Sequence, residues 1–478
     1  MFENSISRRQ LLQQSACGFG AVAANAMLAR TGLASASSGI LGAHHVPKAK
    51  RIIFLFMFGG VSQVDSFDYK PILAQRHGEM MTFNDARQLA KTGKPTEQKL
   101  LNTPWKFKQH GQSGRWVSDL FPGMAEHVDD LCLLHGMHTE GVAHGPATLF
   151  LHCGSTNMTR PSMGSWVNYG LGSENENLPG FVSISPLGPG GPRKYGAAFL
   201  PPKFQGTRLV STNNDRFTID SLSRDNLPIS EVARQVELLQ RLNRQQLDRR
   251  SSHDAELEAA LESHELAWRM QQIAPDVLDC STESAATQKL YGMDDPKTKD
   301  FGQKCLLARR LCESGVRFIE VNYGGDTGNW DQHSDLPKHA DHAKAVDRPI
   351  AGLLQDLKQR GLLEDTIVWW GGEFGRTPYS EGKGTGRDHN PGGFTVWVAG
   401  GGFKAGYAYG ETDEFGFRGI NGRVHMHDLH ATLLHQLGLD HKRLTYKHAG
   451  RDFRLTDVHG HVVHEIIDTT CPRSFFVG

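Results

Sequence analysis

The stretch RIIFLFMF at Arg51–Phe58, followed directly by Gly59 and Gly60, decides the predicted fold. An unbroken apolar run that ends at glycine is typical of a strand buried on both faces, as found in parallel sheets. In open parallel sheets, ligands bind beyond the carboxyl ends of the strands. The segment therefore predicts a central strand whose end borders a candidate site.

Similar apolar runs recur along the chain, with helical patterns between several of them. The runs are Leu131–Leu134, Phe181–Ile184, Val316–Val321, Thr366–Trp370 and Phe394–Ala399. Helical patterns at Lys304–Ser314 and Asp347–Arg360 each precede one of these runs. The alternation predicts an α/β fold with a mostly parallel sheet and right-handed crossovers. A long, charged segment within 226–275 is predicted to form a helical hairpin insertion packed on the main body.

The N-terminus carries the features of an export signal. Two arginines in Ser7–Leu12 precede the small-residue, uncharged stretch Ala16–Leu28, and Ala34–Ala36 offers small residues for cleavage. An arginine pair before such a stretch is the twin-arginine type of signal peptide, read by its own export machinery. We predict a signal at 1–36, a mobile linker at 37–50, one domain at 51–478, and a periplasmic or secreted product.

The composition limits the partners. The 52 basic and 52 acidic residues balance, so nothing indicates binding to nucleic acid or to an anionic membrane surface. No second apolar stretch is long enough to span a membrane. The 24 histidines raise the expectation of a metal site, because histidine is the commonest metal ligand. Cysteines are too widely spaced for a CxxC pair, which leaves one or two disulfides or buried free thiols open.

Carboxylates, imidazoles and guanidinium groups follow the predicted strands or lie close to them. They are Asp65, Asp68, His144, Asp331, His333, Glu373, Arg376, Arg387, Asp388 and His389. Oxygen and nitrogen ligands on separate loops suit a divalent cation such as zinc, manganese, magnesium or calcium. Arg376 could hold an oxyanion bidentately. Either Asp65 or Asp68 could face the site, because a one-residue slip after Gly60 exchanges them.

Other histidines have a plainer interpretation. Those at His425–His435 lie in or before a helix whose leucines pack on the core, so they are expected to be structural. His339 and His342 are three residues apart on a predicted helix and could join the metal site.

Several longer motifs carry a family resemblance. They are FMFGGVSQVDSFDYKP ending at Pro71, HGPATLFLHCG (144–154), RPSMGSWVNYGLG (160–172), NWDQHSD (329–335), GEFGRTP (372–378), GRDHNPGGFTVWVAGGGF (386–403) and HMHDLHATLLHQLGL (425–439). With these motifs the chain resembles the bacterial domain-of-unknown-function family 1501, which is similar to sulfatases and the wider alkaline phosphatase superfamily. The resemblance implies a three-layer sandwich with a metal centre at the strand ends.

Matching the motifs to the superfamily assigns expected metal ligands. The superfamily has an Asp directly after the first strand, where this chain has glycines, so the resemblance leaves Asp65 or Asp68 for that role. Asp331 with His333 resembles the middle motif, and His389 matches a later histidine. Gly-Glu-Phe-Gly stands where Ser-Asp-His-Gly is usual, so Glu373 replaces the Asp and a histidine ligand is missing.

The nucleophile is the main departure from the resemblance. Sulfatases carry Cys or Ser in C/S-x-P-x-R at the start of a helix, and HGPATLFLHCG has similar spacing with His144 at that position and Thr148 in place of the arginine. His144 is then a metal ligand, a nucleophile or general acid/base, or part of a site that has kept only binding. It could also simply cap the helix.

These observations predict an exported metal-dependent hydrolase of sulfate or phosphate esters that uses metal-activated water. Arg376 or Arg387 would stabilise the developing charge. The substrate would be a small-molecule or glycan ester. The alternative is a non-catalytic, metal-stabilised exported protein that binds sulfated or phosphorylated glycans.

Overall fold

The structure is a computed structural model, and it describes residues 41–85, 89, 93–186, 188–211, 217–219, 234, 238, 241–242, 275–324, 329–381 and 384–470. The predicted signal at 1–36 lies outside the described residues, as does nearly all of the predicted insertion at 226–275.

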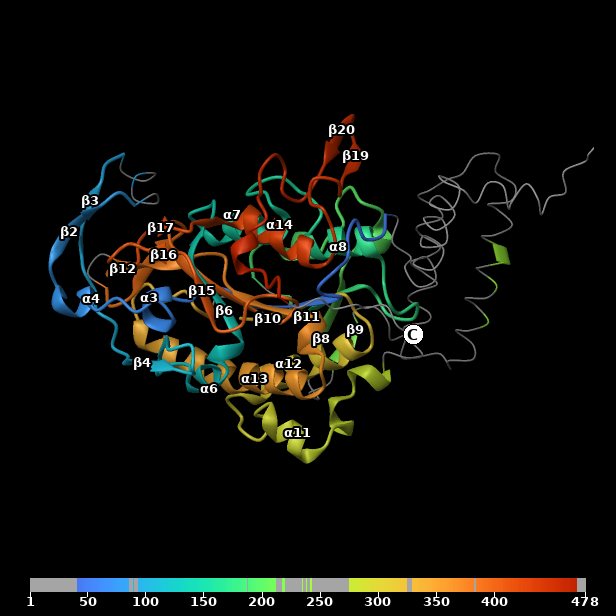
Figure 1. Ribbon diagram of the computed structural model, residues 1–478, viewed down its shortest axis with the longest axis horizontal. Coiled ribbons are helices and arrows are strands. Elements are labelled where there is room, and N and C mark those ends of the chain that lie inside the picture. Colours follow the sequence, from blue (N-terminus) through green and yellow to red (C-terminus); the bar gives the residue numbers. More distant parts are fainter. Residues whose placement is uncertain are drawn as a thin grey trace, which may run out of the picture.

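A ten-stranded sheet runs through the centre of the molecule (Figure 1). Its strands are β1 (Arg51–Met57), β6 (Leu131–His138), β7 (Phe181–Ile184), β8 (Thr207–Ser211), β9 (Phe217–Ile219), β10 (Phe318–Tyr323), β11 (Thr366–Gly371), β14 (Phe394–Ala399), β15 (Tyr407–Tyr409) and β18 (Val424–His425). All six apolar runs of the sequence are strands of this sheet, as predicted. Their order is β15-β6-β14-β11-β1-β10-β7-β8-β9, with β18 also on β6.

Most strand pairs in the sheet are parallel, which confirms the predicted α/β class. β1 lies between β10 and β11, with Ile52 opposite Phe318 and Arg51 opposite Thr366. β14 is antiparallel to both β11 and β6, so β6 runs in the same direction as β1. The carboxyl ends of β1, β6, β10 and β11 therefore meet at one edge.

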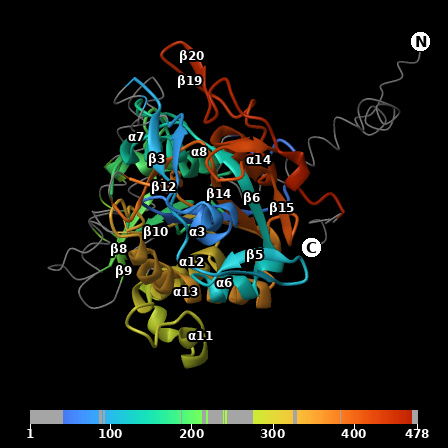
Figure 2. The same cartoon turned by 90° about the vertical axis from the view of Figure 1, so that its left-hand side faces the viewer.

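Helices cover both faces of the sheet. One layer holds α6 (Pro122–Glu126), α11 (Ala285–Leu290), α12 (Lys299–Glu313) and α13 (His339–Gln359); the other holds α7 (His144–Cys153), α8 (Met163–Leu171) and α14 (Met426–Gln436). Figure 2, turned by 90°, shows the same two layers with the sheet between them. The predicted three-layer sandwich is thus the observed architecture.

The strand β1 contributes to both hydrophobic cores, because successive side chains of a strand point to opposite faces. Ile53, Leu55 and Met57 pack with the α12 and α13 layer. The even-numbered residues Ile52–Phe56 pack with the α7, α8 and α14 layer. All seven residues of β1 are buried. This explains why its sequence is continuously apolar rather than alternating.

Short elements lie around the central sandwich. They are α3 (Gln63–Ser66), α4 (Ile72–Gln75), and the two-stranded pairs β2 (Met80–Phe83) with β3 (Thr96–Lys99), β4 (Phe107–His110) with β5 (Arg115–Ser118), β12 (Gly375–Ser380) with β13 (Arg387–Asn390), β16 (Glu411–Thr412) with β17 (Gly419–Asn421), and β19 (Tyr446–His448) with β20 (Arg451–Phe453). The segment Arg387–Asn390 is a buried strand that pairs with β12.

The described part of the predicted linker is attached to the folded body. The backbone N–H of Gly42 donates to Gly170, and those of Lys48 and Ala49 donate to the carbonyl of Gln436. Ala49 is buried. Residues 42–49 therefore belong to the domain rather than to a free linker.

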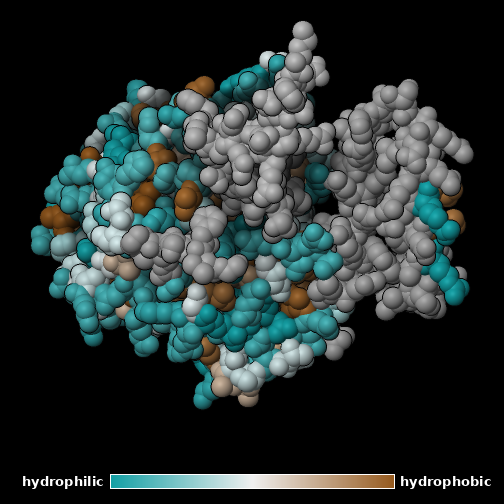
Figure 3. Space-filling view, turned by 45° about the vertical axis from the view of Figure 1, so that its right-hand side comes forward, coloured by the Kyte–Doolittle hydropathy of each residue, from teal (hydrophilic) through white to brown (hydrophobic). Residues whose placement is uncertain are grey.

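The surface and the thiols add little to the site. On the face drawn in Figure 3, apolar side chains lie scattered among hydrophilic ones, which is ordinary for a folded domain. No helix within the described ranges has both the length and the apolar character that a membrane span needs. The cysteines among the described residues, Cys132, Cys153, Cys280, Cys305 and Cys312, are free and buried.

Candidate metal centre

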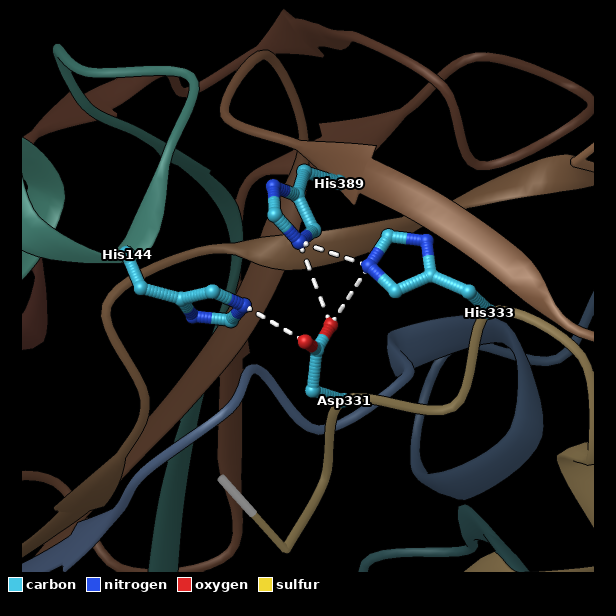
Figure 4. Close-up of side chains that lie close together, drawn as sticks. All are labelled: His144, Asp331, His333 and His389. Carbon is cyan, nitrogen blue, oxygen red and sulfur yellow. Dashed lines mark hydrogen bonds and ion pairs between the residues drawn. The ribbon is translucent and has the colours of Figure 1, made fainter. Parts of the chain in front are cut away.

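Four side chains that could hold a metal ion meet at the carboxyl edge of the sheet: His144, Asp331, His333 and His389. His144 is the first residue of α7, which follows β6. Asp331 and His333 come after β10, and His389 lies in β13. Figure 4 shows the three imidazole rings arranged around the carboxylate of Asp331.

Each imidazole directs its Nε2 atom at Asp331. The Nε2 of His144 lies 3.0 Å from Oδ2, and that of His333 lies 2.7 Å from Oδ1. The Nε2 of His389 lies 3.2 Å from the same Oδ1, and 3.1 Å from the Nε2 of His333. Three nitrogen donors and a carboxylate thus converge on one small volume.

The opposite ring nitrogen, Nδ1, is anchored in each of the three histidines. In His389 it lies 2.9 Å from the carbonyl oxygen of Val142. In His144 it lies 2.6 Å from Oε1 of Glu373, and in His333 it contacts Oε2 of Glu381. A carbonyl or carboxylate partner on the second nitrogen is the usual support of a metal-ligating histidine, because it fixes the ring and its tautomer.

The anchor of His389 decides what its Nε2 presents. A carbonyl oxygen only accepts hydrogen bonds, so the Nδ1 of His389 carries the proton that is donated to Val142. Burial lowers the pKa of His389 to about 4, and the neutral ring therefore turns a lone pair toward Asp331. This lone pair and the carboxylate oxygen of Asp331 are two neighbouring donor atoms that one cation could share. The donor set accordingly fits a bound divalent cation.

The negative charge around His144 also favours a cation at this place. Burial alone would lower its pKa, but the carboxylates of Asp331 and Glu373 outweigh burial and raise the pKa of His144 to about 9. The pKa of Asp331 lies far below its usual range because the three histidines and Arg376 overcome its burial. In the cation-free protein the imidazolium of His144 and the guanidinium of Arg376 together offset the negative charge of Asp331.

Glycine is required at the turn after β1, where the superfamily resemblance led us to expect an Asp. Gly59 has φ +113°, and a Cβ there would lie 2.7 Å from the backbone nitrogen of Trp330 and 2.8 Å from that of Asp331. The backbone N–H of Gly59 donates to Glu373. The close approach of this turn is what brings the loop of Asp331 against the end of β11.

The two predicted catalytic arginines are fully buried and hold other groups. Arg376 donates to the carbonyls of Gly59, Gly60 and Arg387, and its Nη2 lies 2.6 Å from Oδ1 of Asp331. The structure thus brings Arg376 to the edge of the cluster as a support for Asp331. Arg387 forms a bidentate ion pair with Asp65, at 2.7 and 3.1 Å, and also donates to Thr377.

The remaining predicted ligands lie at different distances from the cluster. Asp65 is buried in its pair with Arg387, and Asp68 pairs with Lys70 at 3.1 Å and accepts from Thr412. Glu373 contacts the Nδ1 of His144, the ring nitrogen that does not face Asp331. Asp388 accepts from the backbone N–H of His389, and its Oδ1 lies 4.0 Å from Nδ1 of His333.

Of the two histidines that could have joined the site, neither reaches Asp331. The Nε2 of His339 accepts from the backbone N–H of Ser62, and Nδ1 of His342 lies 3.0 Å from the hydroxyl of Tyr323.

Sequence reasoning missed two supports, Glu381 and the carbonyl of Val142. Glu381 directly follows β12 and reaches His333 only because the β12–β13 pair folds back beside that loop. In the sequence, a glutamate beside a glycine-rich stretch does not indicate a contact with a histidine 48 residues earlier. A backbone carbonyl has no sequence signal at all.

The cluster is open to solvent on one side. The side chains of His333, Asp331 and His144 are 28%, 23% and 17% exposed, whereas that of His389 is 4% exposed. The helix α7 begins at His144 without a side-chain cap, and a Cβ built on Gly145 would meet no atom within 4 Å. Unpaired backbone N–H groups at a helix start favour anions. Free space for a small anion therefore lies beside the cluster.

The fold and the site define the class of this molecule: an α/β sandwich protein with a cluster of three histidines and one aspartate at the carboxyl edge of a mostly parallel sheet. The chain belongs to the family described as "Protein of unknown function (DUF1501)", whose sequence model matches residues 49–467. This confirms the resemblance inferred from the motifs. No curated protein matches the chain in sequence.

Solved structures with similarity to the chain are sulfatases and members of the alkaline phosphatase superfamily. The PsFucS1 sulfatase from Pseudoalteromonas sp. has 11% identity and a TM-score of 0.35, covering 82% of this chain and 68% of that one. An alkaline phosphatase superfamily protein from Vibrio parahaemolyticus has 10% identity and a TM-score of 0.34, covering 84% and 69%. A mutant TAB5 alkaline phosphatase with bound Mg has 10% identity and a TM-score of 0.33, covering 82% and 99%. At such scores the argument for function has to come from the side chains.

Proposed function

We propose that this protein is an exported, metal-dependent hydrolase of sulfate or phosphate esters. The observation that carries the proposal is the convergence of three Nε2 atoms on Asp331, each from a ring whose Nδ1 is anchored by a carbonyl or a carboxylate. Imidazole-rich donor sets favour a transition ion such as zinc over calcium and magnesium, which prefer oxygen ligands. His144, His333, His389 and Asp331 would hold the ion.

The open side of the cluster supports a reactive rather than a structural centre. Structural metal sites are closed, whereas catalytic ones keep a position for water or substrate. An ion held here would polarise an ester oxygen and lower the pKa of bound water. Arg376 fixes the position of Asp331, and Glu373 fixes the ring of His144.

The start of α7 supports an anionic ester as substrate. Its uncapped N–H groups and the free space at Gly145 lie next to His144, where a sulfate or phosphate group could be held. The Nε2 of His144 is then placed either to ligate the ion or to give a proton to the leaving oxygen. With a pKa raised to about 9, His144 carries that proton at neutral pH in the cation-free protein.

Metal analysis and turnover by an Asp331→Asn variant test the proposal. The matched control is Asp335→Asn, because the side chain of Asp335 is 48% exposed and its carboxylate pairs with the exposed Lys338. We expect the Asp331 variant to lose at least about 100-fold in zinc or manganese affinity, since even outer partners of ligands cost 10–100-fold. It should also lose hydrolysis of aryl phosphates and sulfates. Equal metal content and equal turnover in the two variants would refute the proposal.

The two roles of His144 are separable by His144→Ala. If His144 is a ligand, the variant loses metal. If it is the proton donor, metal is retained and turnover falls more for esters with poor leaving groups than for those with good ones.

A binding protein without catalysis is the second candidate function. It is favoured by the arginines, because Arg387 is fully committed to Asp65 and Arg376 to backbone carbonyls and Asp331, so neither is free to stabilise charge on a substrate. Its sign would be metal-dependent binding of sulfated or phosphorylated glycans with no turnover of any ester in the panel. Measurable hydrolysis that is lost in Asp331→Asn would exclude it.

Export through the twin-arginine route remains part of the proposal. It rests on the arginine pair at Arg8 and Arg9. Replacing both arginines by lysine should leave the protein in the cytoplasm, as followed by fractionation, and unchanged export of that variant would contradict this route.

A further inference from the structure

A cavity of about 460 Å³ lies far from the proposed centre and is lined by five histidines. They are His45, His435, His441, His461 and His464, and Asp440 is beside them. The cavity is near the amino edge of the sheet, because residues 48 and 49, just before β1, bond to the carbonyl of Gln436 at the end of α14. The start of α14, at His425, pairs instead with the carboxyl end of β6. α14 thus separates the cavity from the Asp331 cluster.

His45 is oriented like a ligand. Its Nδ1 lies 3.3 Å from the carbonyl oxygen of Val46, which can only accept, so Nδ1 carries the proton and Nε2 carries the lone pair. This Nε2 is buried and has no hydrogen-bond partner among the described residues. A backbone carbonyl on one ring nitrogen and an open lone pair on the other is the arrangement found in metal-ligating histidines.

The spacing of the neighbouring rings suits a shared ion. The ring centroids of His45 and His435 lie 4.4 Å apart, and those of His435 and His464 lie 5.6 Å apart. Two imidazoles bound to one tetrahedral ion, with metal–nitrogen distances of about 2.0–2.1 Å, have centroids roughly 5 Å apart. His435 thus lies between His45 and His464, with ring spacings on both sides close to this value.

Two of the histidines that line the cavity, His435 and His441, favour the neutral ring. Burial lowers the pKa of His435, and the nearby His45 and His464 lower it further. Burial lowers the pKa of His441 to about 4, with Arg454 adding to the effect. Neutral imidazoles keep their lone pairs at physiological pH, and imidazole selects zinc, copper or nickel over magnesium and calcium.

We propose that His45, His435 and His464 form a second metal site, for a divalent transition ion of the zinc type, separate from the Asp331 cluster. Asp440 and His441 line the same cavity and are available as a fourth ligand. The site would tie together three parts of the chain: the segment before β1, the end of α14, and η7 (His464–Ile466).

Zinc titration of the full chain tests the site, with the Asp331→Asn variant as background, in which the proposed centre loses at least about 100-fold in affinity and its binding is separated from that of the second site. In that background we expect one equivalent of zinc to bind. His435→Asn should weaken this binding more than about tenfold, the loss that even outer partners of ligands cause. The control is His110→Asn, in the β4–β5 hairpin outside the cavity, which should leave zinc binding unchanged.

Two outcomes would overturn the proposal. One is no zinc bound in the Asp331→Asn background, and the other is equal affinity in the His435→Asn and His110→Asn variants. A second measurement covers the case in which His435→Asn does not fold. Zinc should protect His45, His435 and His464 of the Asp331→Asn protein several-fold from modification by diethyl pyrocarbonate, and equal modification with and without zinc would overturn the site. Neither result depends on whether the Asp331 cluster binds metal or hydrolyses esters.

Discussion

The two ends of α7 each carry a histidine bound to a glutamate, yet they have opposite surroundings. His144, at the first residue, is 17% exposed, lies against Glu373 and faces the open Asp331 cluster. His152, in the last turn, is 5% exposed, bonds to Glu320 at 3.0 Å and donates to the carbonyl of Thr148. Glu320 also accepts from Ser183 and is fully buried.

The difference teaches that a histidine–carboxylate pair is not by itself a sign of chemistry. In the sealed pair, His152 and Glu320, hydrogen bonds join α7 to β7 and β10 and both side chains are buried. In the open pair the second ring nitrogen is left to face a site.

The largest effect is expected at the sealed end. Glu320→Ala removes the buried carboxylate that bonds to His152 and Ser183, and breaking a buried pair in this way costs about 3–5 kcal/mol of unfolding free energy. Urea unfolding measures the loss. The exposed Glu411→Ala is the control, with an expected change of about 0.5 kcal/mol or less. A loss below about 1 kcal/mol for Glu320→Ala would show that this end is not sealed.

Burial of His430 is expected to make the unfolding free energy depend on pH. The Nε2 of His430 donates to the carbonyl of Leu151 in α7 at 2.8 Å. Burial lowers its pKa from 6.5 to about 4, so the folded state favours the neutral ring. The neutral ring of His430 therefore stabilises the fold fully above pH 6.5. This part of the unfolding free energy, up to about 3 kcal/mol, is lost as pH falls through about 4. Unfolding free energies of the wild type and His430→Gln, measured from pH 7 to 4, should show a shallower pH dependence in the variant. Equal slopes would contradict it.

A smaller effect, on binding rather than folding, is expected at the open end. His144→Ala should reduce metal affinity by about 10–100-fold, because it removes a ring that faces Asp331 and is held by Glu373. The unfolding free energy of the metal-free protein should change by less than that of Glu320→Ala. Competition with a chromogenic chelator measures the affinity. If His144→Ala unfolds the protein as Glu320→Ala does, the two ends do not differ.

The smallest effects are expected from the glycines at the two ends of α7. Gly145→Ala should raise the unfolding free energy by about 0.4–1 kcal/mol, since its Cβ meets open space. Gly154→Ala should lower it by more than about 1 kcal/mol, since Gly154 has φ +64° and its Cβ would lie 2.2 Å from the carbonyl of Leu455. Thermal unfolding of the two variants is the measurement. If both substitutions change the unfolding free energy in the same direction, the two glycines do not differ as predicted.

The sequence was sufficient for the fold and for much of the site, for a simple reason. Continuous apolar runs reveal strands buried on both faces, and parallel strands bring their carboxyl ends to one edge. That logic alone places His144, Asp331 and His333 at the same edge.

The arrangement within the edge could not be predicted. Asp65 and Asp68 follow the first strand as expected, but each faces a cation of its own, Arg387 or Lys70. The direction of a side chain after Gly60 depends on the turn and on its partner. For Asp65 that partner is Arg387, more than 300 residues away in the sequence. Glu381 became a neighbour of His333 only through the pairing of β12 with β13.

The place of β1 in the sheet has a consequence for the order of events during synthesis. Both neighbours of β1 come late in the chain, since Ile52 pairs with Phe318 and Arg51 with Thr366. At ribosomal speeds of about 5–20 residues per second, this strand waits more than about 10 seconds for its first partner. Until then an aggregation-prone segment of seven largely apolar residues is unpaired. Folding of the central sheet is therefore slow and dominated by distant contacts, and a nascent chain of this kind is a natural client for chaperones.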